Sequence, residues 1–213
     1  MRLSSLLANM AENKAFRLDK VAEADFPTRF GAFRIYGFVG HFGDETEEAV
    51  VLKMGSMEGN PPIVRIHSQC LTGDVFHSLR CDCRAQLELA LDKISGEGRG
   101  LIIYEQQEGR GIGIMNKLKA YELQDQGADT VDANLQLGLA VDLRNYELPV
   151  AIMKYFGLSQ VRFLSNNPDK IGALERAGVQ VAERIPAIVE PQQHAEDYLR
   201  TKRDRLGHLL DIF

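Results

Sequence analysis

Short apolar runs separated by turn residues dominate the first third of the chain. Residues 33–39, 49–54 and 63–66 are apolar or alternate between apolar and polar side chains, and glycine, asparagine or proline bounds each run. Runs of this kind are typical of β-strands. Residues 1–20 show no such pattern, and we expect them to form an N-terminal extension, as a short helix or a frayed segment, before one domain at residues 21–213.

Helical and strand patterns alternate in the rest of the chain. Leu87, Leu91 and Ile94 recur at the spacing of one helix face, and this helix should stop near Gly96. Further helices are predicted at residues 114–125, 151–156, 170–176 and 194–210, and further strands at residues 100–104, 161–164 and 179–182. A β-rich first part followed by alternating helices and strands predicts a single mixed α/β domain.

Composition narrows the classes of protein to which the chain can belong. A formal net charge of −5 over 213 residues argues against non-specific binding to nucleic acids. No run reaches the roughly 18 apolar residues of a membrane helix, and the apolar start ends at Asn9, too early for a signal peptide. An odd, low number of cysteines fits a reducing compartment. We therefore expect a cytoplasmic protein that binds neither nucleic acid nor membrane.

The three cysteines of the chain, Cys70, Cys81 and Cys83, lie within 14 residues of one another. Three thiolates without a fourth predict a zinc site, because catalytic zinc keeps one position open for water. Two alternatives remain: a disulfide between two of the thiols, or three inert buried thiols. Asp82, between two of the cysteines, and His67, three residues before the first, could support the ligands or supply a fourth one, and His67 could equally be a core imidazole bonded to the backbone.

Three further segments carry groups suited to a ligand. Residues 105–113 follow a predicted strand and contain three alternating glycines, with Arg110 and Lys117 as charges for phosphate. The spacing fits neither the Walker A loop nor the dinucleotide-binding fingerprint, so a plain tight turn is the alternative. Residues 125–145 could form the wall of a pocket or a solvated helix end. Residues 165–170 could form a binding loop at the end of a strand or an Asx-Pro turn without a ligand.

Residues 65–74, 79–83, 107–113 and 120–125 closely resemble GTP cyclohydrolase II, and the similarity continues through residues 127–134, 142–144 and 165–168. Members of this family convert GTP to a diaminopyrimidine ribosylamine phosphate, formate and pyrophosphate, the first committed step of riboflavin synthesis. The resemblance implies the fold of that family, GTP as substrate, one zinc ion bound by the three cysteines, Mg²⁺ bound with the triphosphate, and a homodimer.

The resemblance also implies roles for individual residues. Arg144 matches the position proposed as nucleophile toward the α-phosphorus, Asp142 the proton acceptor beside it, and Tyr121 a tyrosine near the reacting ring. Because arginine is a poor nucleophile at its usual pKa, Arg144 as a phosphate clamp is the physical rival. The implied substrate-binding residues are Arg65, Ile66, His67, Ser68, Gln69, Gln86, Glu108, Gly109, Arg110, Thr130, Ser165 and Lys170.

Three positions depart from the pattern of the family. Gln69, Arg84 and Ser165 stand where glutamate, glycine and threonine are usual, and none of them removes a metal ligand or a proposed catalytic group. Two other functions are alternatives to this one. A nucleobase deaminase expects His-x-Glu followed by Pro-Cys-x-x-Cys, a succession that the chain lacks. A GTP-binding regulatory module with a structural zinc would need a fourth permanent ligand.

Overall fold

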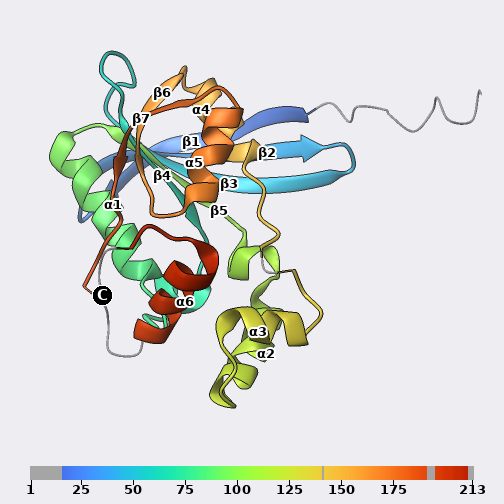
Figure 1. Ribbon diagram of the computed structural model, residues 1–213. Helices are drawn as coiled ribbons and strands as arrows, with labels where there is room; N and C mark the ends of the chain where they lie inside the picture. The colour runs from blue at the N-terminus through green and yellow to red at the C-terminus, as the bar shows by residue number, and fades with distance from the viewer. Residues whose placement is uncertain (1–15, 141, 191–194, 211–213) are drawn as a thin grey trace, which may run out of the picture.

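The computed structural model describes residues 16–140, 142–190 and 195–210. Seven strands form one sheet in the order β1-β2-β3-β5-β4-β6-β7 (Figure 1). The strands β1, β2, β3 and β5 pair antiparallel, and β5, β4, β6 and β7 pair parallel. Their bounds are β1 Phe16–Thr28, β2 Gly31–Phe42, β3 Glu45–Met54, β4 Ile63–Ser68, β5 Gly100–Glu105, β6 Gln160–Leu164 and β7 Gln180–Ile185.

Helices flank the sheet and extend beyond it. The α-helices are α1 Cys83–Glu97, α2 Ile114–Asp125, α3 Thr130–Gln136, α4 Glu147–Tyr155, α5 Pro168–Arg176 and α6 Glu196–Leu206. Two short turns, the π-helical η1 (Leu71–Val75) and the 3-10 turn η2 (Glu108–Gly111), follow β4 and β5. The helices α2 and α3 project away from the sheet, and α6 contacts α3 (Figure 1). In the described part of the chain, no helix is long and apolar enough to cross a membrane.

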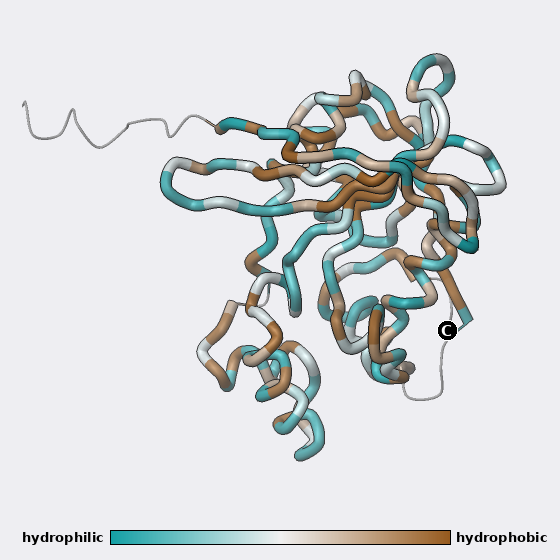
Figure 2. Tube along the Cα trace, turned by 180° about the vertical axis from the view of Figure 1, so that it is seen from behind, coloured by the Kyte–Doolittle hydropathy of each residue, from teal (hydrophilic) through white to brown (hydrophobic). Residues whose placement is uncertain are grey.

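The sheet has a hydrophobic cluster on each face. Neighbouring residues of a strand point to opposite sides, and Ile102 and Ile103 of β5 accordingly belong to different clusters. One face packs against α4 and α5 through residues such as Ile152 and Leu174. The other face packs against α1 through Ile94. Brown colouring in Figure 2 marks the hydrophobic central strands, whereas the tip of the β2–β3 hairpin is hydrophilic.

Strand order creates a crevice at one edge of the sheet. From β4 the chain crosses through α1 to β5 on one side, and later returns to β6 on the other side of β4. Such a reversal leaves a crevice at the carboxyl ends of parallel strands, where ligands bind in open α/β sheets. The segments that follow β4, β5 and β6 meet there, and the amide of Gln69 donates to the carbonyl of Glu105 at 2.8 Å.

Most predicted elements are confirmed, including the mixed α/β domain with its β-rich first part. The prediction for residues 16–20 is wrong: they belong to β1, not to a helix or frayed segment. This edge strand is held by backbone pairing with β2, and most of its side chains are exposed, so it lacks the apolar alternation that marks a strand. Residues 1–15 of the predicted extension lie outside the described residues. Helix α4 begins earlier than predicted, and α6 is shorter.

Candidate functional site

Three sulfur atoms gather at the carboxyl end of β4. Cys70 follows β4, and Cys81 and Cys83 lie at the start of α1. Their Sγ atoms all lie within 4.8 Å of one another, and those of Cys70 and Cys81 are 3.7 Å apart. Bond lengths of about 2.3 Å in a tetrahedral zinc site place two sulfurs about 3.8 Å apart. The thiols are free, so the disulfide alternative is wrong and the cluster has the dimensions of a zinc site.

Gly73 lets the backbone of the loop lie directly against the sulfurs. A Cβ atom at Gly73 would lie 2.8 Å from the Sγ of Cys81 and 3.1 Å from that of Cys70. The hydrogen bond with Cys70 raises the pKa of Cys81 to about 11, and contact with the other two thiols also raises the pKa of Cys83. The three sulfurs therefore cannot all ionise at neutral pH unless a cation lies between them. Their spacing and the repulsion between them when ionised both fit a site for a cation such as zinc.

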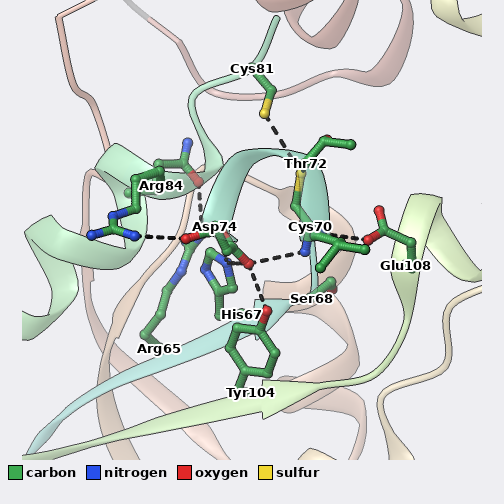
Figure 3. A network of polar contacts seen from close by, with 12 residues as sticks. Arg65, His67, Ser68, Cys70, Thr72, Asp74, Cys81, Arg84, Tyr104 and Glu108 are labelled. Atoms are coloured by element: carbon green, nitrogen blue, oxygen red, sulfur yellow. Dashed lines mark hydrogen bonds and ion pairs between the residues drawn. The ribbon is translucent and has the colours of Figure 1, made fainter. Parts of the chain in front are cut away.

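Asp74 fixes the backbone of the first cysteine. Its carboxylate accepts hydrogen bonds from the amide of Cys70 (3.0 Å) and the hydroxyl of Tyr104 (2.8 Å), and Nε2 of His67 lies 3.1 Å away (Figure 3). Burial lowers the pKa of His67, so the imidazole is neutral. Arg84, one of the departures from the family pattern, donates to the carbonyl of Asp74 at 2.7 Å. Arg84 therefore supports the metal loop.

The donor set of the cluster consists of the three cysteines. His67 is engaged by Asp74, and the two carboxylate oxygens of Asp82 accept from Lys202 and Gln86. Across the described residues, no other group of histidine, cysteine or carboxylate atoms joins or matches the sulfur cluster. Three protein ligands are the number typical of catalytic zinc, whereas structural zinc usually has four.

A cavity extends from the sulfurs into the crevice at the sheet edge. The predicted residues that line it are Arg65, His67, Ser68, Gln69, Cys70, Cys81, Cys83, Gln86, Glu108, Gly109, Arg110, Tyr121, Thr130, Arg144, Ser165 and Lys170. Two predicted residues do not line it. The side chain of Ile66 is fully buried in the core, and Asp142 lies behind Arg144.

The glycine-rich loop is tied directly to the metal loop. Gly109 and Arg110 adopt left-handed backbone conformations (φ 61° and 63°), which is strained for arginine and aims the loop into the cavity. The carboxylate of Glu108 accepts from the amide of Leu71 (2.6 Å) and from Lys117 (2.7 Å). Lys117 also donates to Sγ of Cys70 at 3.1 Å. The charge that we expected to contact phosphate thus lies beside the metal ligands.

Tyr121 lines the cavity together with the cysteines. Its hydroxyl is 3.2 Å from that of Thr72, and the guanidinium of Arg80 stacks 4.8 Å from the ring centroid. Burial raises the pKa of Tyr121, so the phenol keeps its proton at neutral pH. It is therefore a hydrogen-bond donor at the metal end of the cavity.

Three cationic side chains, Arg65, Arg144 and Lys170, line the same cavity, and the part of it around Ser68 is called its cationic end below. Lys170 donates to the carbonyl of Ile66 (3.0 Å) and to Ser68 (3.3 Å), and Arg144 reaches the same serine at 3.5 Å. Burial lowers the pKa of Arg65 to about 10 and that of Lys170 well below its ordinary value. Buried cations that share few counter-charges favour a polyanionic ligand such as a triphosphate.

Arg144 and Asp142 form a bidentate ion pair. Nε of Arg144 donates to one carboxylate oxygen of Asp142 at 2.9 Å, and Nη2 to the other at 2.5 Å. Burial opposes ionisation of both groups, but their pairing outweighs it, so the pKa of Arg144 is raised and that of Asp142 lowered. The guanidinium therefore stays protonated, and Asp142 is a weak base.

The C-terminal segment adds cavity residues that the sequence did not reveal. Tyr198, Lys202 and His208 line the cavity, although residues 194–210 were predicted to form a surface helix. Lys202 is buried and donates to Asp82 at 2.8 Å. These residues occur among many charged neighbours, and no periodic signal in the sequence distinguishes them.

Residues 19–186 match the family model described as GTP cyclohydrolase II. Among curated relatives, the GTP cyclohydrolase-2 of Neisseria gonorrhoeae (strain ATCC 700825 / FA 1090) is 50% identical over 194 residues, covering 91% of this chain and 97% of that protein. The GTP cyclohydrolase-2 of Histophilus somni (strain 2336) is 49% identical over 195 residues, covering 91% and 89%. A two-domain 3,4-dihydroxy-2-butanone 4-phosphate synthase from A. baumannii shares 15% identity at a TM-score of 0.38, covering 70% of this chain and 34% of that one.

Glu105, the last residue of β5, places a carboxyl group in the interior beside the cationic end of the cavity. Its side chain is buried, and neither carboxyl oxygen has a hydrogen-bond partner among the described residues. Burial raises the pKa of Glu105 from 4.5 to about 7, against the opposing charges of Lys170 and Arg144. Ionised Glu105 is therefore unfavourable in the folded protein.

We expect Glu105→Gln to stabilise the protein more at pH 8 than at pH 5. The unfolded carboxyl group ionises near 4.5 and the folded one near 7, so stability is lost as pH rises through this window. The full shift corresponds to at most about 3 kcal/mol. Urea unfolding at both pH values measures the effect, with Glu48→Gln on the exposed face of β3 as control. A difference between wild type and Glu105→Gln that does not change with pH would contradict this assignment.

Proposed function

Because this chain belongs to the GTP cyclohydrolase II family, we propose that it hydrolyses GTP, opening the imidazole ring with release of formate and cleaving off pyrophosphate. This reaction is the first step of riboflavin biosynthesis. One observation carries the proposal: a three-thiolate metal site and a buried cationic cluster lie in the same cavity. A purine nucleoside triphosphate has the groups that each of them would bind.

The metal end of the cavity would hold the guanine ring. Cys70, Cys81 and Cys83 would hold a zinc ion there, and the ion would supply Lewis acidity for a hydrolysis at C8. Tyr121 keeps its phenolic proton and would donate a hydrogen bond near the reacting ring. Lys117 stabilises the negative charge of Cys70 through its 3.1 Å contact.

The cationic end would hold the phosphates. We propose that Arg144 acts as a clamp on the phosphate groups, together with Arg65 and Lys170. Asp142 supports this role, because its bidentate pairing raises the pKa of Arg144 and fixes the plane of the guanidinium. The same pairing opposes a nucleophilic role, which requires a deprotonated guanidine.

The rival function, a regulatory module with a structural zinc, lacks its fourth ligand among the described residues. Both candidates for that ligand, His67 and Asp82, are held by other side chains. Binding of Mg²⁺ with the triphosphate and a cytoplasmic location are further parts of the proposal that rest on the family. For Mg²⁺, the triphosphate supplies the hard oxygen ligands that this ion prefers.

Purified protein should contain one zinc ion per chain and release formate and pyrophosphate from GTP in the presence of Mg²⁺. Cys81→Ser should lose both zinc and formate release, because a hydroxyl is a poor substitute for a thiolate ligand. His77→Asn, on an exposed position of the same loop with φ 57°, should keep both. Metal analysis and formate detection provide the measurements. A zinc-loaded, folded wild-type protein that forms no formate would exclude the proposed activity.

Arg144→Lys should raise KM for GTP more than it lowers kcat. Lysine keeps the charge but not the bidentate fork, and a lost charge-assisted hydrogen bond of about 1.5–3 kcal/mol corresponds to roughly 10- to 100-fold in affinity. Steady-state kinetics with GTP provide the test. Turnover abolished at unchanged substrate affinity would favour the nucleophilic role instead.

We also propose that the protein is a homodimer, as the family resemblance implies. Light scattering of the purified protein at micromolar concentration should give twice the mass of the 23.8 kDa chain. A mass equal to one chain would contradict the proposal.

A further inference from the structure

Asp82 lies between Cys81 and Cys83, and its side chain does not cap the helix that begins after it. It occupies the N-cap position of α1, where an aspartate side chain usually accepts from the helix amides. Here the side chain makes no capping hydrogen bond. One carboxylate oxygen accepts from Lys202 at 2.8 Å and the other from Gln86 at 2.5 Å. The orientation of Asp82 is therefore set by tertiary contacts.

Those contacts connect the metal loop to the sheet and to the C-terminal helix. Gln86 accepts from Arg65 at 2.7 Å, and Arg65 donates to the carbonyl of Leu164 at 3.1 Å. A continuous chain of hydrogen bonds thus runs from α6 through the metal loop to the ends of β4 and β6. Every side chain along it is buried. Hydrogen bonds in such a water-poor interior are costly to break, so they restrict the motion of the side chains that they join, although Nε of Arg65 has no partner among the described residues.

Lys202 is the member of this chain that comes from farthest away in sequence. Its ammonium group is buried, pairs with Asp82 and lies 4.4 Å from the ring centroid of Tyr198. Burial opposes its charge, but Asp82 outweighs burial and raises the pKa of Lys202, so the pair is ionic at neutral pH. A buried ion pair costs desolvation and adds little net stability, but separating its partners would leave a buried charge unpaired, so the two groups stay together.

Other contacts hold α6 in place independently of Lys202. Arg205 pairs with Asp129 and Asp132 at the start of α3, and the amide of Leu209 donates to the carbonyl of Asn166 at 2.9 Å. Leu199 is buried. Loss of the Lys202 ammonium alone should therefore leave the helix docked.

We infer that Lys202 is a positioning residue for the metal centre: by holding the carboxylate of Asp82, it keeps Cys81 and Cys83 at ligating distance from the third sulfur. The inference rests on the zinc site of the proposed function. Residues that orient metal ligands affect metal affinity about 10- to 100-fold. A small rotation at Asp82 would move the sulfurs on both sides of it. The region matched by the family model ends at residue 186, before Lys202.

Lys202→Met tests this inference, because methionine fills the space without charge. We expect its Kd for zinc, measured by competition with a chelator, to rise about 10- to 100-fold. Substitution with cobalt(II) should show altered visible absorption, which reports on ligand geometry. Lys202→Arg should recover most of the affinity. Arg203→Gln, which removes a charge paired with Asp204 on the same helix, should bind zinc as the wild type does.

A double substitution separates positioning from a general loosening of α6. If Lys202 acts through Asp82, then Lys202→Met should add little to the zinc Kd of Asp82→Asn. Fully additive effects would overturn the inference, as would an unchanged zinc Kd and cobalt spectrum in a folded Lys202→Met protein. Circular dichroism establishes folding, and Lys202→Gln replaces the methionine variant if that one does not fold.

The measurements also separate this inference from the proposed function. Zinc affinity is measured without GTP, so a wild-type protein that binds zinc but forms no formate would end the proposed activity and leave the positioning role to be decided by the variants. A wild-type protein that binds no zinc would overturn both.

Discussion

The main physical constraint on this site is that three sulfur atoms lie within 4.8 Å of one another. Thiolates so close repel each other unless a cation lies between them. The surrounding residues accordingly hold the backbone that carries the sulfurs. Asp74 binds the amide of Cys70, Gly73 leaves the space that a side chain would fill, and Asp82 is held from both sides. The site is thus preorganised by contacts to its neighbours.

Sheet topology places this cluster in the same cavity as a group of cationic side chains. Reversal of the strand order at β4 brings the segments after β4, β5 and β6 to one edge. The first of these segments carries Cys70, and the last carries Lys170. A ligand that contacts both groups must combine a site for hydrolytic attack with several negative charges, as GTP does. Fold and chemistry therefore support the same proposed reaction.

Sequence patterns predicted elements whose burial leaves an apolar signature. The strands of the core and the helix α1 were found because their side chains alternate or recur toward a hydrophobic face. Strand β1 was missed because pairing through the backbone leaves no mark on its exposed side chains. The cavity residues of the C-terminal segment, such as Lys202, were missed because a charged residue that faces a buried partner looks in sequence like one that faces water.

The sequence by itself determined the chemistry of the site: three cysteines at short spacing, basic residues for an anion, and a resemblance that identified the family. Tertiary structure decided which groups act together. In the folded chain, Lys202 pairs with Asp82, 120 residues away in sequence. Lys117 lies beside the sulfur of Cys70, and Asp142 lies behind Arg144, outside the cavity. The physical reason is that a side chain carries its own reactivity, whereas its partners, its burial and hence its charge are set by how distant segments pack.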